Sequence, residues 1–312
     1  MTTDNNKTTL EAKFIINKMS SIGYYISIQG NIGGGKSTLL KYIEEYIKEN
    51  KLSAIEDYSS SSSSYNDNHL NNGTYHYLTH NNLYVQDDCI IINPFYIKEE
   101  KDYFIIIDEP IEEWKKEIYT TNLYNENIKD FEKTNMLNYF YKDMSRNGFL
   151  FQVHAFTTRL QKILNKMNEI KNGKKGKIHI IAERSLRTDR LFFLNLYESN
   201  LITKIEFDIY DSFFNLICNE IIKKENIMIY IKTPPEKCNT RINKRDRKEE
   251  INGICPDYLI SLDEQHDRMV NQFEQNLNNK VIRLNFEKDF LDDEFKNLTK
   301  NLMNELLNEI NK

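Results

Sequence analysis

Five short hydrophobic segments recur along the chain, separated by longer polar and amphipathic stretches. They cover residues 24–29, 103–107, 178–182, 227–231 and 281–284. Each segment is a nearly continuous run of β-branched and aromatic residues, which is typical of a strand covered on both faces. The pattern therefore predicts five strands of one buried sheet.

Helical patterns lie between these segments. In the first of them, residues 37–49, the apolar side chains fall on one stripe of a helix: Leu39, Leu40, Ile43, Tyr46 and Ile47. Strands that alternate with helices pair in parallel, because each helix carries the chain back across a face of the sheet. We therefore expect an α/β fold with helices on both faces of a parallel sheet.

A polar tract interrupts this alternation before the second predicted strand. It contains "SSSSSS" and "NDNHLNNG", a composition that buries too little apolar surface to offset its ordering entropy. We expect a mobile low-complexity insertion at about 58–100. Residues 1–22 are predicted to be an N-terminal extension, and 23–312 a single domain that contains the insertion.

The composition limits which binding partners and which cellular compartment the sequence predicts for this protein. The 312 residues include 42 Lys and Arg against 47 Asp and Glu, a net charge of −5, which argues against a broad nucleic-acid surface. No apolar run approaches the ~20 residues of a membrane helix. The four cysteines lack C-x-x-C spacing, so we expect reduced thiols without a disulfide or zinc site. The first residues resemble no secretion or mitochondrial signal, which favours a cytoplasmic protein and leaves nuclear localisation open.

A glycine-rich stretch follows the first predicted strand and opens the first predicted helix. Residues 30–37, "GNIGGGKS", fit the pattern G-x-x-x-x-G-K-[ST] of a phosphate-binding loop. Backbone N–H groups and the helix N-terminus would bind phosphate oxygens, Lys36 would reach the outer phosphates, and Ser37 would ligate Mg²⁺. We expect a loop that binds ATP through Gly30, Asn31, Ile32, Gly33, Gly34, Gly35, Lys36, Ser37 and Thr38.

Two acidic residues end the second predicted strand. Asp108 and Glu109 open "DEPIEEW", at the edge of a parallel sheet where ligands bind. In an ATPase the pair would hold Mg²⁺ and orient water. In a small-molecule kinase, Glu109 would be the general base for a hydroxyl nucleophile. The stretch by itself also fits an exposed acidic strand end.

Residues 149–164 predict a helix with an unusual face. Gln152, Ala155, Phe156 and Arg159 follow one another at helical spacing and share that face. An amide, a small residue, an aromatic ring and a guanidinium together suit a planar ligand with hydrogen-bonding edges. A helix at the boundary between core and solvent would also show this pattern.

Two charged stretches complete the candidates. Glu183 and Arg184 end the third predicted strand, at the same sheet edge as Lys36. A cationic helix face follows at Arg241, Lys244, Arg245 and Lys248. Taken alone, the first pair also fits a structural ion pair and the second a solvated helix. At one sheet edge they would neutralise the charge of a triphosphate.

Taken together, these motifs resemble the deoxyribonucleoside kinase family, and within it the deoxycytidine, deoxyguanosine and deoxyadenosine kinase branch. The resemblance runs from about residue 24 to residue 290, apart from the insertion. It implies a P-loop kinase fold with a five-stranded parallel sheet flanked by helices, a basic lid, and a homodimer. The motifs that carry it are "GNIGGGKST", "DEPIEEW", "FQ" at 151–152, "ERS" at 183–185, "NLYES" at 195–199 and "RINKRDRKEE".

The resemblance also implies roles for individual residues. Glu109 would accept the proton of the nucleoside 5′-hydroxyl, Arg184 would stabilise that oxygen or Glu109, and Glu183 would join Ser37 around Mg²⁺. Tyr141 and Glu250 would bind the sugar 3′-hydroxyl. The rest of the nucleoside pocket would comprise Trp114, Phe151, Gln152, Ala155, Arg159, Asp189 and Phe193. The lid and the donor-base loop would comprise Arg241, Arg245, Arg247, Glu287, Asp289 and Phe290.

One pair of residues bears on the base. Arg159 only donates hydrogen bonds and ionised Asp189 only accepts them, so the two should pair when buried. Asp189 could accept from the exocyclic amine of adenine or cytosine, but would meet the O4 acceptor of thymine, while Arg159 would crowd its methyl group. We therefore expect deoxyadenosine, deoxyguanosine or deoxycytidine to be preferred over thymidine, and we favour deoxyadenosine.

Two other classes of protein stay open at this point. A P-loop ATPase or GTPase switch would hydrolyse nucleotide without any nucleoside, although the chain has no D-x-x-G switch sequence. A kinase for another small molecule, such as a nucleoside monophosphate, would need further cations on the acceptor side of the pocket.

Overall fold

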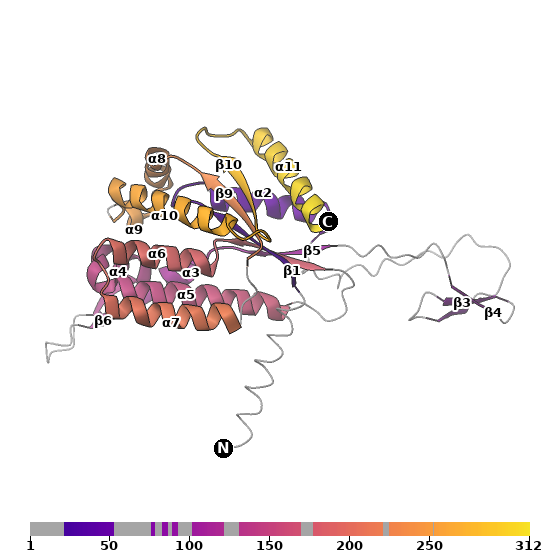
Figure 1. Ribbon diagram of the computed structural model, residues 1–312, viewed down its shortest axis with the longest axis horizontal. Coiled ribbons are helices and arrows are strands. Elements are labelled where there is room, and N and C mark those ends of the chain that lie inside the picture. Colours follow the sequence, from indigo (N-terminus) through magenta and orange to yellow (C-terminus); the bar gives the residue numbers. More distant parts are fainter. Residues whose placement is uncertain are drawn as a thin grey trace, which may run out of the picture.

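The main sheet has five parallel strands in the order β10–β9–β1–β8–β5 (Figure 1). They are β1 (Ile22–Gln29), β5 (Tyr103–Ile107), β8 (Ile178–Glu183), β9 (Ile227–Lys232) and β10 (Lys280–Asn285). The structure, a computed structural model, describes residues 22–52, 76–78, 83–86, 89–92, 102–121, 131–169, 177–220, 225–251 and 253–312. All five predicted strands are present, and the parallel α/β fold is confirmed.

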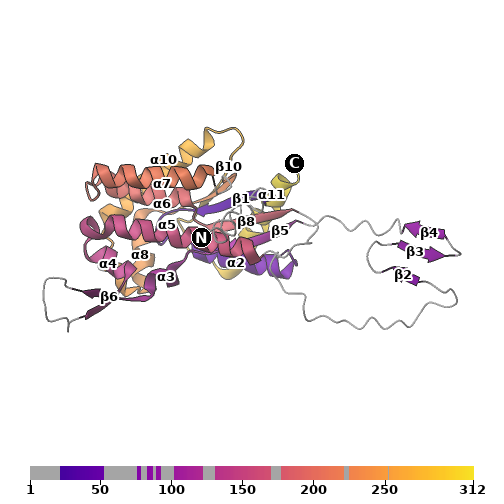
Figure 2. The ribbon, with the colours of Figure 1, turned by 90° about the horizontal axis from the view of Figure 1, so that it is seen from below.

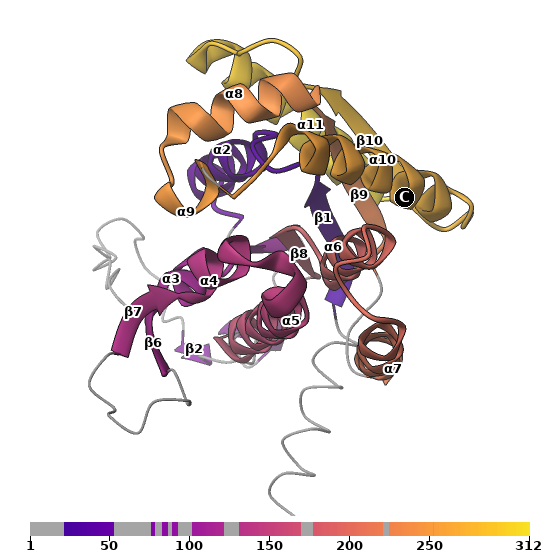
Figure 3. The same cartoon turned by 90° about the vertical axis from the view of Figure 1, so that its left-hand side faces the viewer.

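Helices cover both faces of this sheet, so the molecule has two hydrophobic cores. One face packs against α2 (Lys36–Glu49) and α11 (Asp292–Ile310). The opposite face packs against α5 (Met144–Glu169), α6 (Leu186–Glu198) and α10 (Pro256–Glu274). Figure 3 shows α2 and α5 on opposite sides of the strands. Both faces are buried, which is why the strands are hydrophobic without alternation.

Strand β1 contributes side chains to both hydrophobic cores. Ile26 and Ile28 belong to the core under α2, whereas Tyr25 belongs to the core under α5. Successive side chains of a strand point to opposite faces, so one run of residues supplies both layers. Helix α7 (Lys204–Glu220) packs against α6 on the outer side, and α5, α6 and α7 run side by side in Figure 2.

Shorter elements surround the carboxyl ends of the strands. They are α3 (Ile111–Lys115), the antiparallel pair β6 (Glu117–Thr121) and β7 (Phe131–Asn135), α4 (Met136–Lys142), α8 (Pro235–Arg245) and α9 (Lys248–Ile251). The sequence pattern did not predict the β6–β7 pair. The basic stretch expected to form a lid is helical in α8 and α9.

Within the predicted insertion, three short strands form an antiparallel sheet of their own. They are β2 (His76–Leu78), β3 (Leu83–Gln86) and β4 (Cys89–Ile92). The other residues of the insertion, like the N-terminal extension up to residue 21, lie outside the described residues, so those domain boundaries stay predictions. None of the described helices is long and apolar enough to cross a membrane.

Candidate active site

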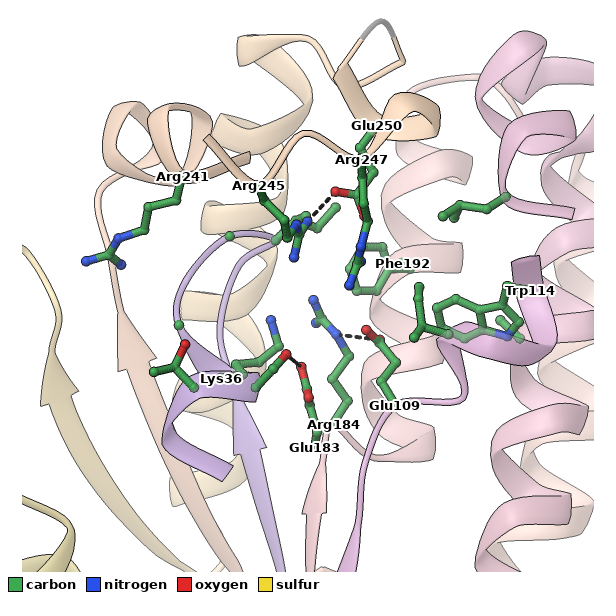
Figure 4. A pocket seen from close by; sticks show the side chains of 18 of the residues that line it. Lys36, Glu109, Trp114, Glu183, Arg184, Phe192, Arg241, Arg245, Arg247 and Glu250 are labelled. Atoms are coloured by element: carbon green, nitrogen blue, oxygen red, sulfur yellow. Dashed lines mark hydrogen bonds and ion pairs between the residues drawn. The ribbon is translucent and has the colours of Figure 1, made fainter. Parts of the chain in front are cut away.

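A cavity of about 520 Å³ opens where β1, β5 and β8 end (Figure 4). Its walls come from the loop before α2, the residues after β5 and β8, helix α5, and the basic segment of α8 and α9. Parallel strands bring their carboxyl ends to one edge of the sheet, which is the usual ligand site of open α/β folds. Sequence positions more than 200 residues apart therefore meet in this cavity.

The glycine-rich loop curls around one end of the cavity. Gly33 and Gly35 have φ angles of 74° and 98°, values that side-chain-bearing residues rarely adopt. Asn31 holds the loop from behind, because its Nδ2 donates to the carbonyl of Leu259 at 2.7 Å. Gly30, Asn31 and Gly34 do not line the cavity, whereas Ile32, Gly33, Gly35, Lys36, Ser37 and Thr38 do. The loop thus presents one face to a ligand and uses the other to fix its shape.

Lys36 is buried beside this loop. Its Nζ donates to the carbonyl of Asn31 at 2.8 Å. Burial, and then the neighbouring charge of Arg184, lower the pKa of Lys36 to about 7, against an opposing effect of Glu183 and Glu109. A cation held out of water next to a phosphate-binding loop gains strongly from an anionic ligand.

Ser37 and Glu183 form an oxygen pair at the bottom of the cavity. Ser37 Oγ donates to Glu183 Oε1 at 2.9 Å. Burial, and then the charge of Glu109, raise the pKa of Glu183. A hydroxyl and a carboxylate beside a phosphate loop fit Mg²⁺, which prefers oxygen ligands and takes the remaining ones from phosphates and water.

Glu109 faces this pair from the end of β5. Its Oε1 lies 3.1 Å from Arg184 Nε and 3.2 Å from Arg159 Nη2. Burial alone would raise the pKa of Glu109, but Arg184, Arg159 and Lys36 together lower it to about 2. Glu109 is therefore an ionised acceptor inside the cavity at neutral pH.

Arg184 carries the most unusual backbone of the site. Its φ angle is 66°, in the left-handed region, and its side chain is buried. Its Nη1 has no hydrogen-bond partner among the described residues, and its guanidinium carbon lies 4.7 Å from the centre of the Phe192 ring. A buried donor without a partner is costly, so this group is poised for an incoming oxygen.

The acceptor side of the cavity contains the predicted pair of Arg159 and Asp189. Arg159 Nε donates to both carboxylate oxygens of Asp189, at 3.1 and 2.9 Å, and Nη1 donates to the carbonyl of Glu183 at 2.9 Å. The same guanidinium also reaches Glu109. The predicted pairing is confirmed, and Arg159 joins this wall of the cavity to the carboxylate of Glu109.

Aromatic side chains enclose the rest of the acceptor side. Phe151 stacks on Phe140 with ring centres 4.5 Å apart and meets the edge of Trp114 at 5.5 Å. Trp114 Nε1 donates to Thr158 Oγ1 at 2.9 Å, which fixes the indole orientation. Gln152 and Ala155 line the same wall. The part of the predicted helix face that carries Gln152, Ala155 and Arg159 is therefore turned toward the cavity. The prediction was wrong for Phe156, which is fully buried, does not line the cavity and packs edge-on against aromatic rings of α7.

The basic segment closes the cavity from the opposite side. Arg247 Nη1 donates to Glu250 Oε1 at 3.0 Å, and Arg245 pairs with the other oxygen of Glu250 (Figure 4). Tyr141 lines the cavity with them. Arg241 instead donates to Asp289, at 3.2 and 2.9 Å, which ties this segment to the loop after β10.

More than half of the chain, residues 96–311, matches the family model described as deoxynucleoside kinase. The chain belongs to the deoxynucleoside kinase family. It is 32% identical to the Probable deoxycytidine kinase of Fowlpox virus over 174 residues, 55% of this chain and 71% of that protein. It is 28% identical to the mitochondrial deoxyguanosine kinase of Xenopus laevis over 191 residues, 58% of this chain and 71% of that protein.

Solved structures agree on the fold. The deoxyadenosine kinase of M. mycoides with bound dCTP superposes with a TM-score of 0.54 at 19% identity, over 90% of this chain and 99% of that one. The phosphate-binding loop precedes the residues matched by the family model, and the fold places it in one cavity with Glu109, Glu183 and Arg184 of the matched part.

Two residues that the resemblance assigned to the kinase site lie elsewhere. Phe193 is fully buried and does not line the cavity; its ring stacks on Tyr210 with centres 4.0 Å apart. One position along α6 turns the side chain by about 100°, so Phe192 faces the cavity and Phe193 faces α7. Glu287 is exposed and also does not line the cavity, because the loop after β10 turns Phe286 inward in its place.

Several residues that line the cavity were not among the residues predicted from the sequence. They are Ile111, Leu137, Phe140, Phe192, Lys244, Tyr258, Phe286 and Phe295. Most are hydrophobic and look like core residues in the sequence. Lys244 was visible as part of the cationic face but received no role. Phe192 and Phe193 lie three and four residues after Asp189, so helical spacing places both near its face and does not choose between them; the rotation of α6 does.

Proposed function

We propose that this kinase transfers the γ-phosphate of ATP to the 5′-hydroxyl of a deoxyribonucleoside, as part of nucleotide salvage. One observation carries the proposal. The ionised carboxylate of Glu109 lies in the same cavity as Lys36 of the phosphate-binding loop, between that loop and the aromatic acceptor wall. A hydroxyl placed on this wall would meet Glu109 on one side and the triphosphate on the other.

Each charged residue has a distinct task in this proposal. Lys36 and the loop backbone hold the donor phosphates, and Arg245 and Arg247 neutralise charge from the lid side. Mg²⁺, held through Ser37 and Glu183, would supply charge neutralisation at the phosphates when bound. Most of the rate in such transfers comes from positioning and charge stabilisation.

The hydroxyl itself is handled by two residues. Glu109 orients the 5′-hydroxyl as an acceptor and takes its proton as the new P–O bond forms. With a pKa near 2, Glu109 is a weak base. This suits a transfer in which the proton leaves late and the carboxylate mainly aligns the nucleophile. Arg184 donates to the same oxygen or to the transferred phosphoryl group through its unpartnered Nη1.

The proposed substrate is deoxyadenosine, deoxyguanosine or deoxycytidine in preference to thymidine, with deoxyadenosine favoured. Asp189 is an acceptor on the base-binding wall, and an exocyclic amine can donate to it directly or through water, whereas thymine has no such amine. The names of the similar proteins, which cover deoxycytidine, deoxyguanosine and deoxyadenosine kinases, agree with this range of bases.

One assay separates this proposal from its alternatives. ATP consumption would be measured with each of the four deoxynucleosides, with their monophosphates, and without an acceptor. We expect consumption only with deoxynucleosides and least with thymidine. Hydrolysis that ignores the acceptor would support an NTPase, and turnover with monophosphates only would support a nucleotide kinase.

A matched pair of variants then tests the role of Glu109. Glu109→Gln should bind ATP nearly normally but transfer phosphate about 10²–10⁴-fold more slowly. The neighbouring Asp108 is mostly exposed and pairs with Lys162 at 2.8 Å. Asp108→Asn should therefore stay close to the natural activity. The opposite ranking of the two variants would favour the ATPase interpretation, in which Asp108 holds Mg²⁺.

We also propose a cytoplasmic homodimer that forms through α7. Its exposed apolar side chains Ile205, Ile209 and Leu216 lie within about 40° of one another around the helix, with exposed fractions of 74%, 56% and 60%. Helix α5 also carries an exposed apolar side chain, Leu150, which is 51% exposed. Such a patch typically marks an interface. Ile209→Asp should convert the dimer to a monomer in light scattering, and a natural chain that is monomeric at micromolar concentration would refute the interface.

A further inference from the structure

Behind the cavity lies a buried carboxylate to which the proposed reaction assigns no task. Glu225 precedes β9 and is only 6% exposed. Its two oxygens accept hydrogen bonds from Ser27 Oγ of β1 and, at 3.0 Å, from Ser185 Oγ at the start of α6. Burying a carboxylate in this way costs free energy, so we looked for what the buried Glu225 does for the structure around it.

Gln29 extends this hydrogen-bond network toward the cavity. Its Nε2 donates to Ser27 Oγ at 2.9 Å and to Ser185 Oγ at 3.1 Å. Its Oε1 accepts from Thr188 Oγ1 at 2.5 Å, and Thr188 Oγ1 accepts from the backbone N–H of Ser185 at 3.1 Å. The network thus joins the last residue of β1 to the first turn of α6 (Ser185 caps α6).

The directions of these hydrogen bonds depend on the charge of Glu225. An ionised carboxylate only accepts, so both serine hydroxyls donate to it and keep their lone pairs for the Gln29 amide. A protonated Glu225 must instead donate one hydrogen to a serine oxygen. The hydrogen of that serine then turns away from the carboxylate and loses its buried acceptor, which weakens the network that holds Gln29. The serine hydroxyls that hold Gln29 are therefore oriented by the protonation state of Glu225.

Both ends of the network adjoin the reaction centre. Gln29 is followed by Gly30, which begins the phosphate-binding loop with a φ angle of 146°. Ser185 follows Arg184, whose left-handed backbone is sustained only if its neighbours hold it. The backbone N–H of Arg184 also donates to the carbonyl of Ile28 in β1, at 3.0 Å.

We propose that Glu225 is a positioning residue, whose ionised form holds the phosphate-binding loop and Arg184 in register for phosphoryl transfer. Glu225 touches no substrate and acts only through Ser27, Gln29 and Ser185. The inference goes beyond the proposed function but uses its activity as a readout.

The proposal also makes transfer sensitive to pH. Burial raises the pKa of Glu225 to about 7, against the opposing effects of Arg187 and the Ser185 hydroxyl. Among the residues that the structure describes, the charged and titratable groups that face Glu225 are Arg187 on α6, whose Nε lies 3.6 Å away, and Tyr25 on β1. The pKa of Tyr25 is raised, first by burial and then by Glu225, so it stays neutral near pH 7.

The test compares kcat against pH for the natural chain and for Glu225→Gln, with saturating ATP and deoxynucleoside. In the natural chain, kcat should fall as the pH drops through 7. The glutamine variant mimics the protonated carboxyl, so its kcat should be about tenfold lower at pH 8 and show no such fall. The KM for the nucleoside should stay unchanged, because no cavity residue is altered. Glu198→Gln, at the other end of α6, is the matched control and should keep the natural profile.

Several outcomes decide the proposal. If the natural chain phosphorylates no deoxynucleoside, the proposed function fails and the positioning role for phosphoryl transfer fails with it. If the natural chain is active and Glu225→Gln has the same pH profile, the positioning role is refuted. Should Glu225→Gln fail to fold, Ser27→Ala replaces it: losing one donor to the carboxylate should move the acidic fall of kcat to higher pH, and an unmoved profile overturns the inference.

Discussion

The pair of Arg159 and Asp189 allows the construction of the acceptor wall to be tested by a double-mutant cycle. Both side chains are buried, and Arg159 Nε lies 2.9 Å from Asp189 Oδ2. Removing one partner of a buried pair leaves the other charge uncompensated, at a typical cost of about 3–5 kcal/mol. We expect Asp189→Ala to lie near the lower end of that range, because Arg159 keeps Glu109 as a partner.

Replacing Arg159 instead leaves Asp189 as the buried group without its partner. In Arg159→Met, Asp189 loses its guanidinium, and burial already raises the pKa of Asp189. The carboxyl should then take up a proton near neutral pH, which limits the loss to about 3 kcal/mol. Glu109 also loses one of its two arginines, so phosphate transfer should slow as well.

The double variant decides whether the two side chains stabilise each other. Arg159→Met with Asp189→Ala removes both charges, so its cost should fall short of the summed single costs by about 2 kcal/mol or more. Urea denaturation of the natural chain, both single variants and the double variant measures this coupling. Costs that add within about 0.5 kcal/mol would refute mutual stabilisation. In activity assays the double variant should also gain turnover of thymidine, and no gain would contradict the base-selection argument.

Three further predictions follow from single features of the structure. Because the folded-state pKa of Glu225 is raised to about 7, the natural chain should lose about 3 kcal/mol of stability as the pH rises from about 4.5 through 7. Glu225→Gln should lack this loss of stability when the two proteins are compared by urea denaturation at pH 5 and pH 8. The same pH dependence of stability in both proteins would contradict a raised pKa of Glu225. Gly35→Ala places a Cβ 2.9 Å from the Phe286 ring at a φ of 98°, so it should cost about 1–3 kcal/mol and weaken ATP binding in calorimetry. Phe192→Ala should raise the nucleoside KM with little loss of stability, because Phe192 lines the cavity. Phe193→Ala should lower the free energy of unfolding by about 3–5 kcal/mol and leave the cavity lining intact. A raised KM in Phe193→Ala and a large loss of stability in Phe192→Ala would mean that α6 is rotated.

Much of the fold and part of the site follow from local patterns in the sequence. The strands can be predicted from the sequence because burial on both faces requires continuous β-branched runs, regardless of which strands lie next to them in the sheet. The glycine-rich loop can be predicted because the positive φ angles at Gly33 and Gly35 favour glycine at these two positions, directly before a helix. The helix face with Gln152 and Arg159 follows from the fixed spacing of an α-helix. Each of these signals is contained in a few neighbouring residues.

Only the tertiary structure decides what meets across the sheet. The rotation of α6 selects Phe192 over Phe193, and the turn after β10 selects Phe286 over Glu287, because packing between distant elements sets both. Glu225 gave no signal in the sequence, since its partners Ser27 and Ser185 lie 198 and 40 residues away. The sequence determined which chemical groups the chain carries and on which elements they lie. The packing of those elements determined which groups share a cavity, because contact depends on distances that local patterns do not encode.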